Sequence, residues 1–298
     1  AEELIEPASA VDHSRLAALY VMVAQCWQAG RLEEAVRYSD AGQLVVSDRS
    51  NEVPYGVQGW LGSAYLAIGQ PERTVEWGRA ELARGRDTHS LTRAALVQAL
   101  MIAGSPDEAM AEATGLLDAA EATHNPYAFA FAHLAYGFAF READPDRARD
   151  VLRRGLVIAE DSGNRLNETY LAQVLAQLEA VNGGPLAALD YTALAIRNHH
   201  DSGNTIQVRA CLAVLARLFD HLRRYEAAAT IAGFAFNPIT AAWYGEITTV
   251  IAHLRDVHGD QTYEALAHIG EAMTTTEIAA YAYDQIDQAR AELDAVSK

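Results

Sequence analysis

The chain has 298 residues, a formal net charge of −17 at pH 7, and 50% apolar against 21% charged residues. This composition is typical of a folded globular protein. The acidic excess argues against direct nucleic-acid contact, which needs a basic face. No apolar stretch reaches the roughly 18–20 residues that span a bilayer. We therefore expect neither a membrane span nor direct nucleic-acid binding.

The N-terminal sequence AEELIEPASA lacks the basic start and apolar core of a signal peptide, and it does not begin with Met. We expect a cytoplasmic segment of a larger multidomain protein. Cys26 and Cys211 lie far apart inside helical patterns. They are expected to be buried thiols in a reducing compartment rather than a disulfide.

A turn motif recurs through residues 1–235. Prolines occur at four turns, and each is followed three positions later by a small residue. One turn upstream and one turn downstream have the small residue at the same spacing but lack the proline. Proline suits the first position of a helix, where its missing N–H is not needed. The prolines are Pro71, Pro106, Pro145 and Pro185, and the small residues are Ala35, Thr74, Ala109, Ala148, Ala188 and Ala228.

Helical runs with apolar residues at i, i+3, i+4 and i+7 precede these turns, as in LGSAYLAIG, LVQALMIAG and LAQVLAQLEA. Each unit is therefore predicted to be a helix, a tight turn and a second helix. In SPDE, Ser105 and Glu108 have the spacing of a capping box. Asp144 can cap the helix that begins at Pro145.

The tetrapeptide DSGN occurs at residues 161–164 and again at 201–204. Its period matches the turn motif, which predicts a link between one unit and the next rather than an anion-binding loop. Gly163 and Gly203 can take the left-handed conformation that ends a helix. Asn164 and Asn204 can cap the helix that follows, as Asn125 can one unit earlier.

Residues 126–140, PYAFAFAHLAYGFAF, carry aromatic side chains at alternate positions near their start, as a strand does. The same residues also form two apolar stripes at helical spacing. We favour a helix that is apolar on two faces, as an inner element of a stack requires. Its aromatic rings are predicted to form core between layers rather than a ligand pocket.

The pattern changes at Asn237-Pro238, after which three helical segments follow. We predict that residues 236–298 are closing helices over the open end of the repeats. Thr276 is the expected cap of the last helix.

The fold class predicted from these patterns is all-α: a right-handed superhelical stack of antiparallel helix pairs. About six units with a period of 35–40 residues fill 1–235, and the closing helices complete one continuous domain.

The unit resembles the tetratricopeptide repeat, most clearly at Leu61, Gly62, Tyr65 and Gly69. The period of 39–40 exceeds the 34 residues of that repeat. The closing stretch DVHGDQTYEALAHIGEAMTTTEIAAYAYDQIDQARAEL resembles the C-terminal region of large actinobacterial regulators. These join a signalling ATPase to helical repeats and carry a cyclase-like or LuxR-type DNA-binding domain. The resemblance implies that the chain is a sensor or scaffold that controls an ATPase module of the same polypeptide.

Residue spacings typical of catalysis are missing from the sequence. There is no HExxH, CxxC, GxSxG or phosphate-loop motif, and neither cysteine has a nearby histidine. We expect no cofactor, no metal site and no enzymatic activity in this segment. A free-standing peptide-binding adaptor is the alternative function, and an all-helical enzyme with a pocket at 126–140 is the third and weakest.

A binding groove is the more useful hypothesis. In stacked helix pairs, the first helix of each pair lines the concave side, where polar residues can bind a peptide, a protein or a small effector. Projection of the tetratricopeptide frame gives nine candidate residues. They are Gln98, His133, Arg141, Tyr170, Gln173, Gln177, Arg217, Asp220 and His221.

Overall fold

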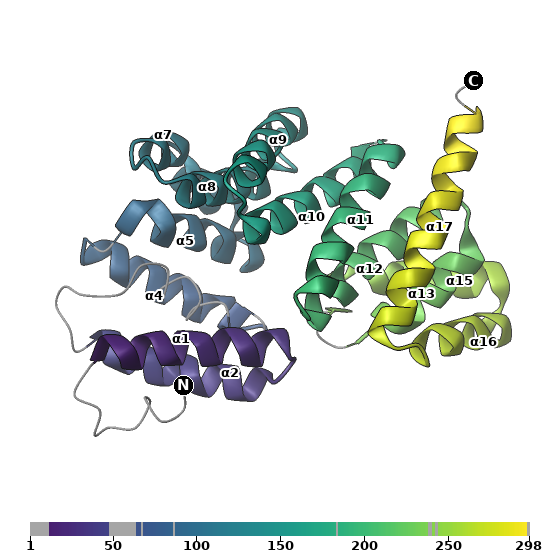
Figure 1. The fold of residues 1–298 in the computed structure, drawn as a ribbon, viewed down its shortest axis with the longest axis horizontal. Coiled ribbons are helices and arrows are strands. Elements are labelled where there is room, and N and C mark those ends of the chain that lie inside the picture. Colours follow the sequence, from purple (N-terminus) through teal and green to yellow (C-terminus); the bar gives the residue numbers. More distant parts are fainter. Residues whose placement is uncertain are drawn as a thin grey trace. The chain divides into compact units, whose positions relative to one another are not determined.

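The computed structural model describes residues 12–47, 64–66, 68–85, 87–182, 184–237, 240–241 and 244–296. Throughout these ranges the regular secondary structure is helical and contains no strand, which confirms the all-α class (Figure 1). Among the helices of these residues, none combines the length and the apolar character needed to cross a membrane.

The helix bounds follow the predicted units. The elements are α1 (Asp12–Gln28), α2 (Leu32–Ser47), α4 (Pro71–Ala83), η2 (Thr88–Ser90), α5 (Leu91–Ile102), α6 (Pro106–Ala113), α7 (Leu116–Glu121), α8 (Pro126–Phe140), α9 (Pro145–Asp161), α10 (Arg165–Asn182), α11 (Pro185–Asp201), α12 (Thr205–His221), α13 (Tyr225–Ala235), α15 (Glu246–His258), α16 (Asp260–Glu271) and α17 (Thr275–Val296).

The chain divides into two compact units, Ala1–Asn167 and Glu168–Lys298, with the division inside α10. In the first unit α1 packs against α2, α4 against α5, and α8 against α5 and α9. In the second unit α12 packs against α11 and α13, α16 packs against α13, and α17 lies beside α11 (Figure 1). The helical-repeat character predicted from the sequence is therefore present within each unit. The predicted boundary at 235/236 stays a prediction.

The predicted turn motif has the expected structure. All four prolines are the first residue of a helix, α4, α6, α9 or α11. The six small residues of the motif are all buried, and none is more than 3% exposed. A small side chain at each of these positions lets the two helices of a pair approach closely.

Both DSGN segments link units as predicted. Gly163 and Gly203 have φ angles of 68° and 71°. Asn164 Oδ1 accepts a hydrogen bond from the backbone N–H of Asn167 at 3.2 Å, and Asn204 Oδ1 accepts one from Gln207 at 3.2 Å. These contacts satisfy N–H groups that a helix start leaves unpaired.

The other caps correct the sequence analysis in two places. Asp144 caps α9 as predicted, whereas the Ser105 side chain makes no cap hydrogen bond to α6. The last helix is capped by Thr274, not Thr276. Thr274 Oγ1 accepts from the backbone N–H of Glu277 at 3.3 Å, and Glu277 Oε2 accepts from the backbone N–H of Thr274 at 2.7 Å. This reciprocal pair is a capping box. The prediction of Thr276 placed the start of the helix two residues too late and therefore missed it.

Residues 126–140 form the predicted helix, α8, and Cys26 and Cys211 are both buried and form no disulfide. The helix that begins at Pro106 is divided into α6 and α7, with Thr114 as the C-cap of α6 and Gly115, at φ 76°, as the N-cap of α7. Of the residues that carry the tetratricopeptide resemblance, Tyr65 and Gly69 are described, while Leu61 and Gly62 lie outside the described residues.

The second unit contains a close helix crossing between α13 and α16. A Cβ atom added to Gly233 would lie 2.0 Å from the carbonyl oxygen of Ala267, and one added to Gly270 would lie 1.8 Å from that of Thr230. Backbone therefore contacts backbone from both sides. A neighbouring backbone cannot rotate away as a flexible side chain can, so this crossing requires glycine.

We expect Gly233→Ala and Gly270→Ala each to lower the free energy of unfolding by about 3 kcal/mol, because the added methyl group forces α13 and α16 apart. Urea unfolding measures the change. Gly245→Ala is the matched control, since its Cβ would meet only the carbonyl oxygen of Ala241, at 3.8 Å. Equal stability of all three variants would contradict the close crossing.

Candidate functional site

Three of the nine candidate residues lie in the first unit. His133 on α8 is 4% exposed and contacts the Phe129 carbonyl oxygen through Nδ1 at 2.8 Å. Burial lowers the pKa of His133 below its ordinary value. Arg141 donates to the Phe138 carbonyl oxygen at 3.0 Å and stacks on the Phe138 ring at 4.0 Å. Both side chains thus interact with their own helix, and Gln98 on α5 has a buried Nε2 without a hydrogen-bond partner.

The other six candidates lie on two helices of the second unit. Tyr170, Gln173 and Gln177 lie on α10, and Arg217, Asp220 and His221 lie on α12. Gln173 is only 4% exposed, whereas Tyr170 and Gln177 are half-buried and His221 is exposed. The following contacts show which of these side chains the fold brings together.

Gln173 is the centre of a buried polar cluster, which we define as Gln173, His199, Gln207 and Tyr244. Gln173 Nε2 donates to Gln207 Oε1 at 3.2 Å and to the Tyr244 hydroxyl at 2.8 Å. Both amide hydrogens are then used, so Gln173 Oε1 is the acceptor for His199 Nε2–H at 3.4 Å. Four separate elements, α10, α11, α12 and the turn before α15, are thereby joined by one side chain.

His199 is held neutral inside the cluster. It is 3% exposed, and its ring lies edge-on to Tyr170 with 5.5 Å between ring centroids. Burial lowers the pKa of His199 from 6.5 to about 3. The imidazole is therefore a structural hydrogen-bond donor at neutral pH and does not exchange protons there.

A second set of contacts joins α12 to α15. Arg217 forms an ion pair with Glu246, and Asp220 Oδ1 lies 2.8 Å from His253 Nδ1. The Tyr225 ring on α13 packs edge-on against His253 with 5.8 Å between ring centroids. Gln173, Arg217 and Asp220, three residues predicted to face a ligand, thus each contact residues 244–253 of the same chain.

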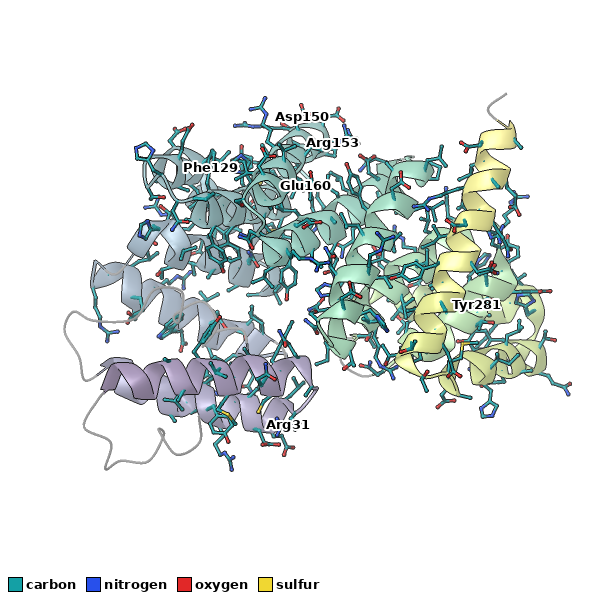
Figure 2. The ribbon with its side chains drawn as sticks, viewed as in Figure 1. Arg31, Phe129, Asp150, Arg153, Glu160 and Tyr281 are labelled. Carbon is teal, nitrogen blue, oxygen red and sulfur yellow. The ribbon has the colours of Figure 1, made fainter. Side chains whose placement is uncertain are left out.

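The outer face of α9 in the first unit has a different character. Asp150, Arg153 and Glu160 lie there and are exposed to solvent, on the helix that packs beside α8 (Figure 2). Such interspersed charges are typical of a solvated helix face. This face provides exposed control positions outside the polar cluster.

Three members of the polar cluster were not candidates from the sequence. Gln207 lies three residues after Asn204, which caps the start of α12. The recurring DSGN tetrapeptide, which ends at Asn204, therefore marked its position. His199 stands beside His200 in the sequence, and no motif there marks it as part of a site. Tyr244 follows the interruption at Asn237-Pro238, and no pattern in the sequence indicates that this segment folds back onto α10.

The described residues offer little for catalysis. They contain no group of three His, Cys, Asp or Glu side chains arranged to hold a metal ion. Burial raises the pKa of the Cys211 thiol, which disfavours the thiolate that a nucleophile needs. The contacts of this site are hydrogen bonds and ion pairs within the chain.

Comparison with known proteins does not assign a family. The sequence matches no protein-family model, and the search of curated proteins finds no match.

We expect Gln173→Leu to lower the free energy of unfolding by about 2–3 kcal/mol, because His199, Gln207 and Tyr244 all lose their buried partner. Urea unfolding is the measurement. Gln177→Leu on the same helix is the matched control, since its side chain is half-buried outside the cluster. Similar losses in both variants would show that the cluster contributes no special stability.

The lowered pKa of His199 predicts a pH dependence. Unfolding restores a pKa near 6.5, so the unfolded state binds a proton that the folded state excludes, and stability falls as pH drops below 6.5 toward 3. For one group this loss is about 2 kcal/mol at pH 5. Urea unfolding at pH 7 and pH 5 should show a smaller loss in His199→Gln than in the unsubstituted chain; equal losses would refute the assignment.

Proposed function

We propose that this chain is a non-enzymatic helical-repeat segment of a cytoplasmic signalling or transcriptional regulator. In this proposal it binds a protein, a peptide or a small effector and controls an ATPase module of the same polypeptide. The helix pairs of each unit are proposed to stack in chain order as a right-handed, tetratricopeptide-like superhelix. The thiols of Cys26 and Cys211 are buried and form no disulfide, which favours a reducing compartment.

One observation carries the binding function. Polar side chains of two successive first helices, α10 and α12, converge on residues 244–253 and hold them by hydrogen bonds and an ion pair. A face that can hold a segment of its own chain has the chemistry to hold a segment of another protein. Helix-in-groove binding uses the same combination of apolar contact and polar anchors.

The proposed control works by differential affinity. A ligand shifts an equilibrium between two states only when it binds one state better than the other. A helical stack suits this role because successive pairs contact mainly their neighbours, so binding at one pair changes the packing of the next. The resemblance of the C-terminal stretch to signalling-ATPase regulators supplies the identity of the controlled module.

The test compares the full polypeptide encoded with this chain against a version that lacks residues 12–296. Deletion is expected to change the rate of ATP hydrolysis by about fivefold or more, because allosteric coupling is typically worth 1–3 kcal/mol. Steady-state phosphate release measures it. Asp150→Ala on the exposed face of α9 is the control and should leave the rate unchanged.

An unchanged rate together with an unchanged response to ligand would contradict the proposal. Partner binding without any effect on nucleotide turnover would instead support the free-standing adaptor.

A further inference from the structure

Residues 244–258, which we name the closing arm, contact the second unit through one face. The polar contacts come from Tyr244, Glu246 and His253, and they reach Gln173, Arg217 and Asp220. We name the set Gln173, Gln207, Arg217 and Asp220 the acceptor face. Glu246 and His253 are two helical turns apart, so both side chains lie on the same side of α15.

The apolar side of the closing arm is narrow. Ile247, Val250 and Leu254 are 2%, 5% and 0% exposed, at one residue for each turn of α15. Thr248, Thr249, Ala252, Asp256 and Val257 are exposed on the remaining surface. This is the pattern of an amphipathic helix seated on a surface by its i, i+3 and i+7 residues.

The neighbouring closing helices are held more firmly. The α16 backbone contacts the α13 backbone at Gly233 and Gly270, as described above. Arg224, at the start of α13, binds three residues of α17, and these are Gln285, Gln288 and Glu292. The closing arm is anchored by the buried side chains of Ile247, Val250 and Leu254 and by half-exposed polar contacts, with 35% and 65% exposure for the Arg217 and Glu246 pair. Ion pairs of this exposure contribute little stability.

Glycine occurs at both ends of α15. Gly245 precedes it, and Gly259 follows it with φ 76° and ψ 152°, a conformation that only glycine adopts readily. Segments of this kind absorb the backbone rotation when a helix moves as a unit. Arg255 of the closing arm also forms ion pairs with Asp260 and Glu264 of α16, so the closing arm is joined to α16 as well as to the acceptor face.

We propose that the closing arm is an internal occupant of a docking site, and that the external ligand of the acceptor face is an amphipathic helix of a partner protein. The partner helix carries a carboxylate at a position i and an imidazole or cation at position i+7. Its apolar residues lie at positions i+1, i+4 and i+8. Arg217 takes the carboxylate, and Asp220 takes the cation. This inference rests on the proposed function and names the class of its partner.

The test uses a fluorescent peptide of residues 244–258 added to the full chain. In the arm variant, Tyr244→Phe with Glu246→Gln and His253→Gln, the internal occupant is weakened while the acceptor face is intact. Its apparent affinity for the peptide should rise by about tenfold, because a larger fraction of molecules has a free face. Adding Arg217→Ala and Asp220→Ala to the arm variant should lower its affinity for the peptide by about tenfold. Fluorescence anisotropy measures both changes.

Two controls accompany these variants. Asp256→Asn, on the exposed side of the closing arm, should leave peptide affinity unchanged, and a peptide of scrambled order should not bind. Amide hydrogen exchange should be faster in α15 of the arm variant while α13 and α16 keep their protection. Glu246→Gln alone should produce the same change at smaller amplitude if the triple variant folds poorly.

Three results would overturn the inference. The first is equal peptide affinity in the unsubstituted chain and the arm variants, and the second is exchange of α15 together with α13 as one cooperative unit. The third is dimerisation of the arm variant by exchange of closing arms, seen in gel filtration. Peptide binding without any change in ATP hydrolysis would refute the proposed function alone.

Discussion

The close approach of paired helices at small residues is the constraint on which the rest of this structure depends. A single helix hairpin cannot bury its apolar side, so each pair needs a neighbour. Close contact is achieved where the motif places Ala35, Ala109, Ala148 and equivalent residues at the start of the second helix, all fully buried. Proline at the preceding turn fixes where each of several such helices begins, which keeps the small residue in register with the facing helix.

The same constraint explains why polar residues gather where they do. Helices packed on both sides bury their flanks, and a side chain such as Gln173 becomes buried at 4% exposure despite its polarity. A buried amide must satisfy its donors and acceptor. Gln173 does so with side chains from three other elements, so the cluster joins α10 to α11, α12 and the turn before α15. At this site, a residue that the sequence predicted to face a ligand therefore joins elements of the fold itself.

The second unit ends differently from a simple array of repeats. Its closing helices contact the repeats in three ways: α15 through side chains on α12, α16 through backbone contact on α13, and α17 through Arg224. These contacts differ in how much motion they tolerate. Backbone contact at Gly233 and Gly270 permits almost none, whereas exposed ion pairs exchange readily with solvent.

Local features of the sequence determined the helices of this protein. Proline at helix starts, left-handed glycine after helix ends and asparagine caps act within a few residues, so their effect can be predicted from spacing alone. Thr276 was a wrong cap because the helix register there depends on Glu277, which caps back onto Thr274. The polar character of α10 and α12 was also visible, which brought Gln173, Arg217 and Asp220 into the candidate site.

Only the tertiary structure decided what those residues contact. Tyr244, Glu246 and His253 reach the acceptor face because residues 244–258 pack against α12, and no local pattern encodes that packing. Burial of His199 is likewise a property of three packed helices rather than of its neighbours in sequence. Periodicity specifies which side of a helix is apolar, while the identity of the partner on that side follows from long-range packing.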